Sequence, residues 1–218
     1  MKRPLVFLAA SLALASGLVS AGPLAYVANE KSASVSIIDT DGERQLAEIA
    51  VGKRPRGIAV GPDRLYLSDG ATGRLLVVDT RQRRLLRSVP VGDSPEGVSR
   101  SRDGRWLAVA VEDDNSVVLL DARSSRVVAR IKVAGKNPEH AVFSPDGRWL
   151  YVSAEEAEQV DVIDLKTRQQ VASIAVGKRP RGIAFLPDGS RAYVACELAG
   201  KVYTVDVASR QVLAEIAV

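Results

Sequence analysis

The sequence predicts an all-β fold made of repeated four-stranded sheets, and two observations carry this prediction. Similar apolar runs end in an aspartate with spacings of 40, 42, 43 and 42 residues, at Asp39, Asp79, Asp121, Asp164 and Asp206. The segment IAVGKRPRGIA also occurs twice without change, at Ile49–Ala59 and Ile174–Ala184. Each unit holds four short runs of Val, Ile, Leu and Tyr, separated by Gly, Pro, Asp or Asn. Four strands in about 40–45 residues are typical of a β-propeller blade.

The units are expected at residues 24–51, 55–91, 95–133, 138–176 and 180–218, with strands a to d running outward from the channel. In the fourth unit the strands read AVFS, WLYVSA, VDVIDL and QQVASIAV. These runs are too short for helices and carry turn residues at both ends. The first unit begins at a strand b, Leu24–Ala28, with no strand a before it. The count is therefore about five blades, four complete and one of three strands.

The two ends of the sequence raise the question of ring closure. The last five residues, AEIAV, repeat Ala47–Val51, where the chain continues as GKRPRGIA. Closed propellers have about four to eight blades, and an open sheet edge promotes aggregation. We therefore expect the sequence to be part of a larger ring that is truncated at its C-terminus. An open arc, a dimerising half and a five-blade ring are the alternatives.

The N-terminus predicts export to the periplasm. Lys2 and Arg3 precede an apolar run from Pro4 to Val19, and small residues lead to a cleavage site after Ala21. This pattern is typical of a secretory signal peptide over residues 1–21, and the run is too short to span a membrane. The remaining chain has 28 basic and 26 acidic residues, a balance that argues against a nucleic-acid partner. Cys196 is alone, and no haem-attachment, CxxC, HExxH, Walker or GxSxG motif occurs.

The strand b segments YVAN at Tyr26, YVSA at Tyr151 and YVAC at Tyr193 carry a family resemblance. Together with the VID-type strand ends and the P-D-G turns, they resemble the YVTN-repeat β-propellers over the whole mature chain. The segment Asn137–Leu165 is similar to periplasmic propellers associated with PQQ-dependent alcohol catabolism. This resemblance implies a ring of about seven blades and a periplasmic dehydrogenase or cytochrome as partner. Haem and PQQ enter only by this analogy, because no motif for binding a cofactor is evident.

Candidate binding residues fall where the d–a and b–c loops open on one end of the channel. One column precedes a recurrent glycine and alternates in charge around the arc: Arg56, Glu96, Glu139 and Arg181. A second column follows strand b and contains Glu112 and Glu155, with Glu30 and Glu197 in the outer blades. A ring of carboxylates around a channel concentrates cations or cationic groups. The run Glu112 to Asn115 offers hard oxygen ligands, but its spacing lacks the order of a calcium loop.

His140 is the only histidine, and it stands where the other complete blades have Gly57, Gly97 or Gly182. A structural interpretation has the imidazole hydrogen-bonded to a neighbouring glutamate at a tight rim. A functional interpretation makes it a haem or metal ligand, or an acid/base beside Glu139. With one histidine, a site built from several imidazoles is excluded, so any metal would need Glu139, Glu155 or Glu112 as further ligands.

Three functions remain open. The first is a non-enzymatic binding module serving a PQQ-dependent oxidation or electron-transfer system, favoured because no nucleophile–base constellation is present. The second is a propeller that handles a cofactor or catalyses a reaction, of the d1-haem or lactonase type, using His140 and nearby glutamates. The third is a surface scaffold of repeats. The sequence leaves the oligomeric state and the ligand open.

Overall fold

The structure, a computed structural model, describes residues 23–218, so the predicted signal peptide lies outside the described residues. These residues form nineteen strands and no helix. The first sheet has three strands, β1 (Leu24–Asn29), β2 (Ser34–Asp39) and β3 (Arg44–Ala50). Four antiparallel sheets of four strands follow, which confirms the predicted count of four complete blades and one of three strands.

The four complete blades follow the chain in order. The second blade comprises β4 (Pro55–Val60), β5 (Arg64–Asp69), β6 (Arg74–Asp79) and β7 (Arg84–Pro90). The third comprises β8 (Pro95–Arg100), β9 (Trp106–Val111), β10 (Ser116–Asp121) and β11 (Val127–Lys132). The fourth comprises β12 (Pro138–Phe143), β13 (Trp149–Ala154), β14 (Gln159–Asp164) and β15 (Gln169–Ala175). The fifth comprises β16 (Pro180–Phe185), β17 (Arg191–Cys196), β18 (Lys201–Asp206) and β19 (Val212–Ala217).

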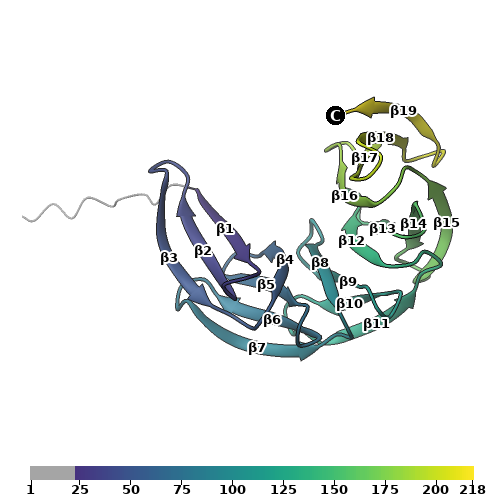
Figure 1. Cartoon of the computed structure of the whole chain (residues 1–218). Coiled ribbons are helices and arrows are strands. Elements are labelled where there is room, and N and C mark those ends of the chain that lie inside the picture. Colours follow the sequence, from purple (N-terminus) through teal and green to yellow (C-terminus); the bar gives the residue numbers. More distant parts are fainter. Residues whose placement is uncertain (1–22) are drawn as a thin grey trace, which may run out of the picture.

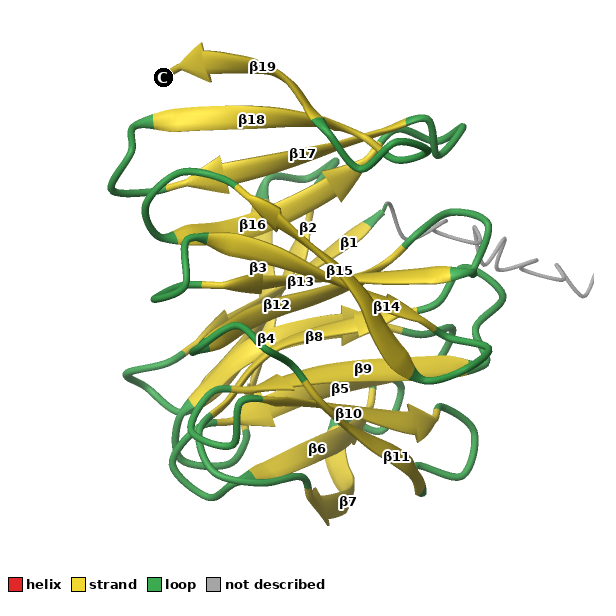
Figure 2. Ribbon diagram, turned by 90° about the vertical axis from the view of Figure 1, so that its right-hand side faces the viewer, coloured by secondary structure: helices red, strands yellow, loops and turns green. Residues whose placement is uncertain are grey.

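The blades are arranged side by side in an open arc (Figure 1). Strands β4, β8, β12 and β16 line its concave side, and β7, β11, β15 and β19 form its convex side. Seen from the side, the sheets stack with their strands crossing the arc from one rim to the other (Figure 2). The starts of the inner strands therefore meet at one rim, and their ends meet at the opposite rim.

Four separate hydrophobic cores hold neighbouring blades together. The strand period of two sends alternate side chains to opposite faces of each sheet. In the second blade, Leu65 and Leu67 contact the first blade, whereas Tyr66, Leu75 and Val77 contact the third. The third blade repeats this division, because its Val109 contacts the second blade and its Ala108 contacts the fourth. Each blade is thus stabilised by the blades on either side of it.

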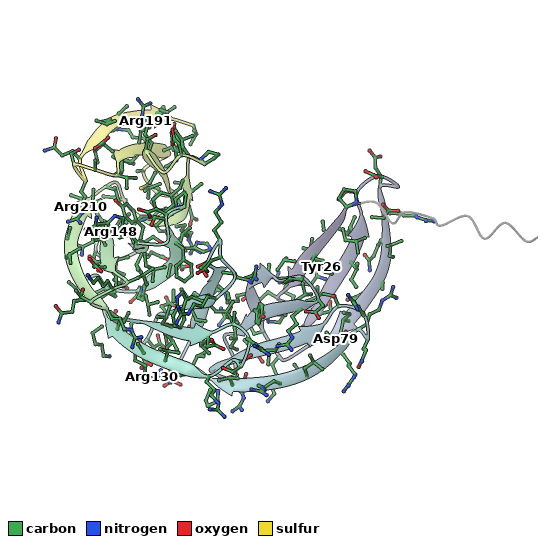
Figure 3. All side chains as sticks on the ribbon, turned by 180° about the vertical axis from the view of Figure 1, so that it is seen from behind. Tyr26, Asp79, Arg130, Arg148, Arg191 and Arg210 are labelled. Carbon is green, nitrogen blue, oxygen red and sulfur yellow. The ribbon has the colours of Figure 1, made fainter. Side chains whose placement is uncertain are left out.

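Aromatic side chains reach across these junctions. The Tyr66 hydroxyl donates to the carbonyl of Ala122 in the third blade at 3.0 Å. Tyr151 packs edge-on against Phe185 of the fifth blade, with ring centroids 4.9 Å apart. Arg148 and Arg210, which lie beside each other in Figure 3, both cover the ring of Trp149.

The recurrent aspartates have a structural role in the turns. Each lies at the end of a strand c and accepts backbone N–H groups of the following turn. Asp79 accepts from Arg81 at 2.8 Å and Gln82 at 2.6 Å, and Asp164 accepts from Lys166 at 2.7 Å. Short carboxylates fix turns in this way because they bond the backbone two or three residues on.

Candidate functional site

The predicted residues meet in one pocket at the rim where the inner strands begin. This pocket, called the rim pocket below, has a volume of about 230 Å³. It is lined by Ala28, Glu30, Pro55, Arg56, Gly57, Glu96, Gly97, Glu139, His140 and Arg181. Five of the seven site residues predicted from the sequence lie here, contributed by four blades. Glu112 and Glu155 do not line the pocket.

A repeated backbone feature brings the alternating column to this rim. Each inner strand starts at a proline, and the pairing with its neighbouring strand is then interrupted by a bulge. Arg56 and Glu96 lie in such bulges, as do Glu139 and Arg181. A bulge leaves a residue unpaired and re-aims its side chain, often beside a functional site. Here the bulges direct the column into the rim pocket instead of along the sheet.

The glycines that follow two of these residues are required by close contact with the next blade. A β-carbon on Gly57 would lie 2.6 Å from the backbone nitrogen of Val98. One on Gly97 would lie 2.6 Å from the carbonyl oxygen of Glu139 and would collide with the His140 ring. At Gly182, by contrast, no described atom lies nearer than 4.0 Å. Packing between blades thus accounts for Gly57 and Gly97 and does not account for Gly182.

His140 occupies this column in the same register as its glycine counterpart in the second blade. Its backbone N–H donates to the Ser153 hydroxyl at 3.1 Å, as that of Gly57 donates to the Ser68 hydroxyl at 2.8 Å, and in both blades the pairing is shifted by one residue after the proline. The imidazole then lies over Gly97 of the third blade and reaches Arg181 of the fifth. One side chain therefore connects three consecutive inner strands.

The hydrogen bonds of His140 differ from the sequence prediction. We expected a glutamate partner, but Nδ1 lies 3.1 Å from the carbonyl oxygen of Arg181. A carbonyl only accepts, so Nδ1 carries the proton and donates it. Burial lowers the pKa of His140, which keeps the ring neutral near pH 7. Nε2 is then the free acceptor, and it makes no hydrogen bond within residues 23–218.

One side of the rim pocket is held by the ion pair of Arg56 with Glu96. It joins the second and third blades, and the Glu96 side chain is only 3 % exposed. Burial raises the pKa of Glu96 to about 7, against the opposing effect of Arg56. Glu112 also raises it, because a second carboxylate disfavours ionisation nearby. Glu96 therefore titrates near neutral pH.

The other side is organised around Arg181. Its guanidinium lies 3.4 Å from Glu139, 3.2 Å from Glu155 and 2.8 Å from Glu197. Glu139 is only 5 % exposed, and burial raises its pKa to about 8. Glu155 has a lowered pKa, because hydrogen bonds from Glu139 and from Arg179 outweigh its desolvation. The carboxyl pair therefore shares one proton, with Glu139 as the donor and Glu155 as the acceptor.

Glu112 supports the rim from outside the pocket. Its carboxylate accepts from the Ser94 hydroxyl at 3.0 Å and from the Asn137 amide at 3.3 Å. It thus ties together the d–a loops before β8 and β12. No group of three or more His, Cys, Asp or Glu residues suited to a metal occurs within residues 23–218. The run from Glu112 is thus a loop support in this structure.

Sequence reasoning missed two arginines of the site. Arg54 bonds Glu30 at 2.6 Å, and Arg179 bonds Glu155. Buried Asp69 fixes the first of them by accepting the backbone N–H of Arg54 at 2.8 Å. The signal was present, because both arginines belong to the repeated GKRPRG segment that also contains Arg56 and Arg181.

Comparison with known proteins agrees with this architecture. The class of the protein is a β-propeller, defined by antiparallel blades around a channel. A hydrazine synthase of Kuenenia stuttgartiensis matches with a TM-score of 0.78 and 25% sequence identity, over 86% of this chain and 61% of that chain. A functionally unknown protein from Desulfotomaculum acetoxidans matches with a TM-score of 0.73 and 15% identity, over 83% of this chain and 61% of that one. The chain thus spans less than two thirds of the length of either.

The family is shown by sequence. The Cytochrome D1 heme domain model matches residues 105–217, slightly more than half of the chain. The chain belongs to this family of propeller haem domains. No curated protein sequence matches it significantly. The finding supports the predicted propeller and not the narrower YVTN or PQQ-associated family. No helix within residues 23–218 is long and apolar enough to cross a membrane.

Proposed function

We propose that this propeller is a haem-related binding module whose rim pocket presents His140 to the iron of a haem-type cofactor. The observation that carries the proposal is the state of His140. Its Nδ1 proton is donated to the Arg181 carbonyl, its ring is neutral, Nε2 makes no hydrogen bond within residues 23–218, and the residue lines a pocket to which five blades contribute. Histidines that bind a metal ordinarily donate a hydrogen bond from the N–H of their other ring nitrogen to a carbonyl or carboxylate, as His140 does. Membership of the Cytochrome D1 heme domain family supports it independently.

The residues present would offer one ligand to such a group. Of the residue types that hold haem iron (His, Cys, Met and Tyr), His140 is the one that lines the rim pocket in the described part of the chain. The pocket volume of about 230 Å³ lies below the ~300–1,000 Å³ of ordinary ligand sites. A pocket of this volume would not enclose a whole macrocycle, so a haem held by His140 would lie largely outside the rim pocket. When bound, a haem supplies redox chemistry at its iron.

The surrounding residues fix the orientation of the imidazole, and two nearby glutamates can hold protons. The bond to the Arg181 carbonyl fixes the ring orientation, and the Ser153 hydroxyl donates to the second lone pair of the same oxygen at 2.8 Å. Packing on Gly97 prevents the ring from rotating away. Glu139 and Glu96, whose pKa values lie near 8 and 7, can each hold a proton beside the ligand at neutral pH.

The test is reconstitution of the purified full chain with hemin, read by its visible spectrum. The expected result is a red-shifted Soret band in the wild type and its loss in His140→Gly, which restores the residue of the sibling blades. Because the chain has one histidine, a band typical of imidazole ligation is assigned to His140 without further mapping. Glu155→Gln is the matched control, since it alters the rim charge and leaves the ligand in place. Equal spectra for wild type and His140→Gly would overturn the proposal.

Localisation and partners belong to the same proposal. The signal-peptide pattern over residues 1–21 supports export to the periplasm, where a cytochrome or dehydrogenase would be the partner. The association with PQQ-dependent alcohol oxidation depends on the segment Asn137–Leu165 alone. The free imidazole favours the haem-related function over that association.

A further inference from the structure

Exposed arginines are concentrated in two neighbouring blades, at the rim opposite to the rim pocket. Each blade has a turn at this rim between its strands c and d. In the second and third blades, these turns and the residues that follow them hold six exposed arginines: Arg81, Arg83, Arg84, Arg87, Arg123 and Arg126. These six residues are called the basic face below.

The arginines of the two blades lie on one continuous surface. Strands β7 and β11 follow one another along the convex side of the arc (Figure 1). The Arg87 guanidinium donates to the carbonyl of Ser124, and that of Arg64 donates to the carbonyl of Arg123 at 3.1 Å. Both hydrogen bonds run from the second blade to the c–d turn of the third. They therefore hold the two halves of the basic face together.

The basic face is not neutralised by carboxylates of the same chain. Residues 79–87 and 121–126 hold six arginines and two aspartates, a net charge of +4, whereas residues 22–218 as a whole have 28 basic and 26 acidic residues. Both aspartates are engaged in their turns, because Asp79 accepts from the Arg81 backbone at 2.8 Å and Asp121 from the Ser124 backbone at 2.7 Å. Within residues 23–218, no ion pair joins an arginine of the basic face to a carboxylate.

Protection of sheet edges does not account for these arginines. The outer strand of each blade is a sheet edge, and charged side chains discourage pairing with another chain. However, β15 is an outer strand of the same kind and has no charged residue. In the first blade, the equivalent residues 39–47 hold three acidic residues and one arginine. The repeat therefore does not require arginines here, and their concentration in two adjacent blades indicates a binding partner of opposite charge.

The composition of the basic face favours a protein as this partner. Three exposed apolar side chains, Leu85, Leu86 and Val127, lie among its arginines in the sequence. Protein interfaces are enriched in arginine, which binds carboxylates through two parallel hydrogen bonds. Surfaces that bind membranes ordinarily add exposed Trp or Tyr, and those that bind single-stranded nucleic acid add aromatic rings for stacking. Every Trp, Tyr and Phe of residues 23–218 is instead buried or partly buried.

We propose that the basic face docks the acidic surface of a protein partner. Its arginines pair with carboxylates of the partner, and the three apolar side chains are covered at the contact. The bond of Arg87 to the Ser124 carbonyl holds its guanidinium in place beforehand, so less conformational entropy is lost on docking. Opposite charges also speed the encounter of the two proteins. The basic face shares no residue with the rim pocket, so this inference does not depend on the proposed haem function.

The experiment titrates the full chain into a labelled peptide of alternating glutamate and glycine, read by fluorescence anisotropy. The comparison peptide has glutamine in place of glutamate and carries the same label. We expect the wild type to bind the glutamate peptide and not the glutamine peptide, with an affinity that falls as salt is added. The combined variant Arg84→Gln, Arg123→Gln and Arg126→Gln should bind about tenfold to a hundredfold more weakly, because each exposed ion pair contributes a factor of up to about five.

Two variants serve as controls. The combined variant Lys166→Gln, Arg168→Gln and Arg191→Gln removes the same charge from the same rim, in the fourth and fifth blades, and should bind the glutamate peptide like the wild type. His140→Gly should also bind it normally, which separates this proposal from the proposed haem function. Absence of binding to the glutamate peptide, or an equal loss in the two combined variants, would overturn the proposal.

Vesicles of phosphatidylglycerol and duplex DNA test the other classes of partner. Tighter binding to either one, lost in the variant of the basic face, would assign this surface to a lipid or to nucleic acid and would also overturn the proposal. If the combined variant of the basic face fails to fold, Arg123→Gln and Arg126→Gln decide the matter singly. Each should weaken binding of the glutamate peptide by up to about fivefold.

Discussion

Replacement of His140 by glycine tests both the architecture of the rim and the protonation state of the imidazole. The change removes the hydrogen bond from Nδ1 to Arg181 and the contact with Gly97. The lost hydrogen bond costs about 0.5–1.5 kcal/mol. A glycine inside a strand costs a further ~0.5–1 kcal/mol. The Arg181 carbonyl keeps its bond from Ser153, so no buried acceptor is left unsatisfied. We expect the free energy of unfolding to fall by about 1–3 kcal/mol at pH 8.

The difference between wild type and variant should depend on pH in a defined direction. Burial lowers the pKa of His140 below its ordinary 6.5, so the unfolded chain binds this proton more readily than the folded one. The stability that the neutral imidazole contributes is complete above pH 6.5 and is lost as the pH falls through the folded-state pKa. Glu139 and Glu96 are present in both proteins, so their contributions largely cancel in the difference.

Thermal unfolding of both proteins between pH 5 and pH 8 provides the assay. A change of 1 kcal/mol moves Tm by about 2–4 °C in a protein of this size. The Tm of His140→Gly should therefore lie about 2–12 °C below that of the wild type at pH 8, with a smaller gap at pH 5. A gap that stays constant or widens toward pH 5 would refute the neutral, buried imidazole.

Three other predictions concern the same rim. Gly97→Ala should reduce the free energy of unfolding by about 1–3 kcal/mol, because the new methyl group would lie 2.6 Å from the Glu139 carbonyl oxygen. The control Gly182→Ala should change it by less than about 0.5 kcal/mol. Equal urea midpoints for the two variants would contradict the packing at Gly97. Arg56→Ala should lower the free energy of unfolding by up to about 3 kcal/mol at pH 8, because it leaves the buried Glu96 carboxylate without its partner. The loss should be smaller at pH 5, where Glu96, with its pKa of about 7, is neutral. A loss that does not change with pH in urea titrations would argue against this ion pair. Glu139→Gln should flatten the dependence of Tm on pH. Burial raises the pKa of Glu139 to about 8, so the neutral carboxyl contributes stability that is complete below pH 4.5 and is lost as the pH rises through 8. An unchanged slope of Tm against pH would show that this carboxyl does not titrate there.

The sequence predicted the fold closely because the repeat carries independent copies of one pattern. The four-stranded blades and the three-stranded first sheet were evident from spacing and turn residues, although β12 begins three residues earlier than the predicted run AVFS. The column through Arg56 and Glu139 was also predictable, since each member precedes the same repeat position. These features depend on local chemistry that each blade specifies for itself.

The partner of His140 was not predictable, because it depends on how closely the neighbouring blades approach the ring. The imidazole lies over Gly97 of the third blade, and Nδ1 donates to the backbone carbonyl of Arg181 in the fifth, a group that no side-chain pattern indicates. The raised pKa values of Glu96 and Glu139 likewise follow from burial at blade junctions. The sequence pattern of one blade does not predict how deeply the neighbouring blade buries its side chains.

The four separate cores between blades give the protein the thermodynamics of a linear stack. Each blade contacts only its neighbours, so stability is a chain of nearest-neighbour couplings and not the property of a single core. The third blade is covered on both faces, whereas β19 exposes Leu213 at 53% and Ile216 at 49%. Amide exchange should accordingly be slowest in β9 and β10 and fastest in β19, a gradient of protection along the arc.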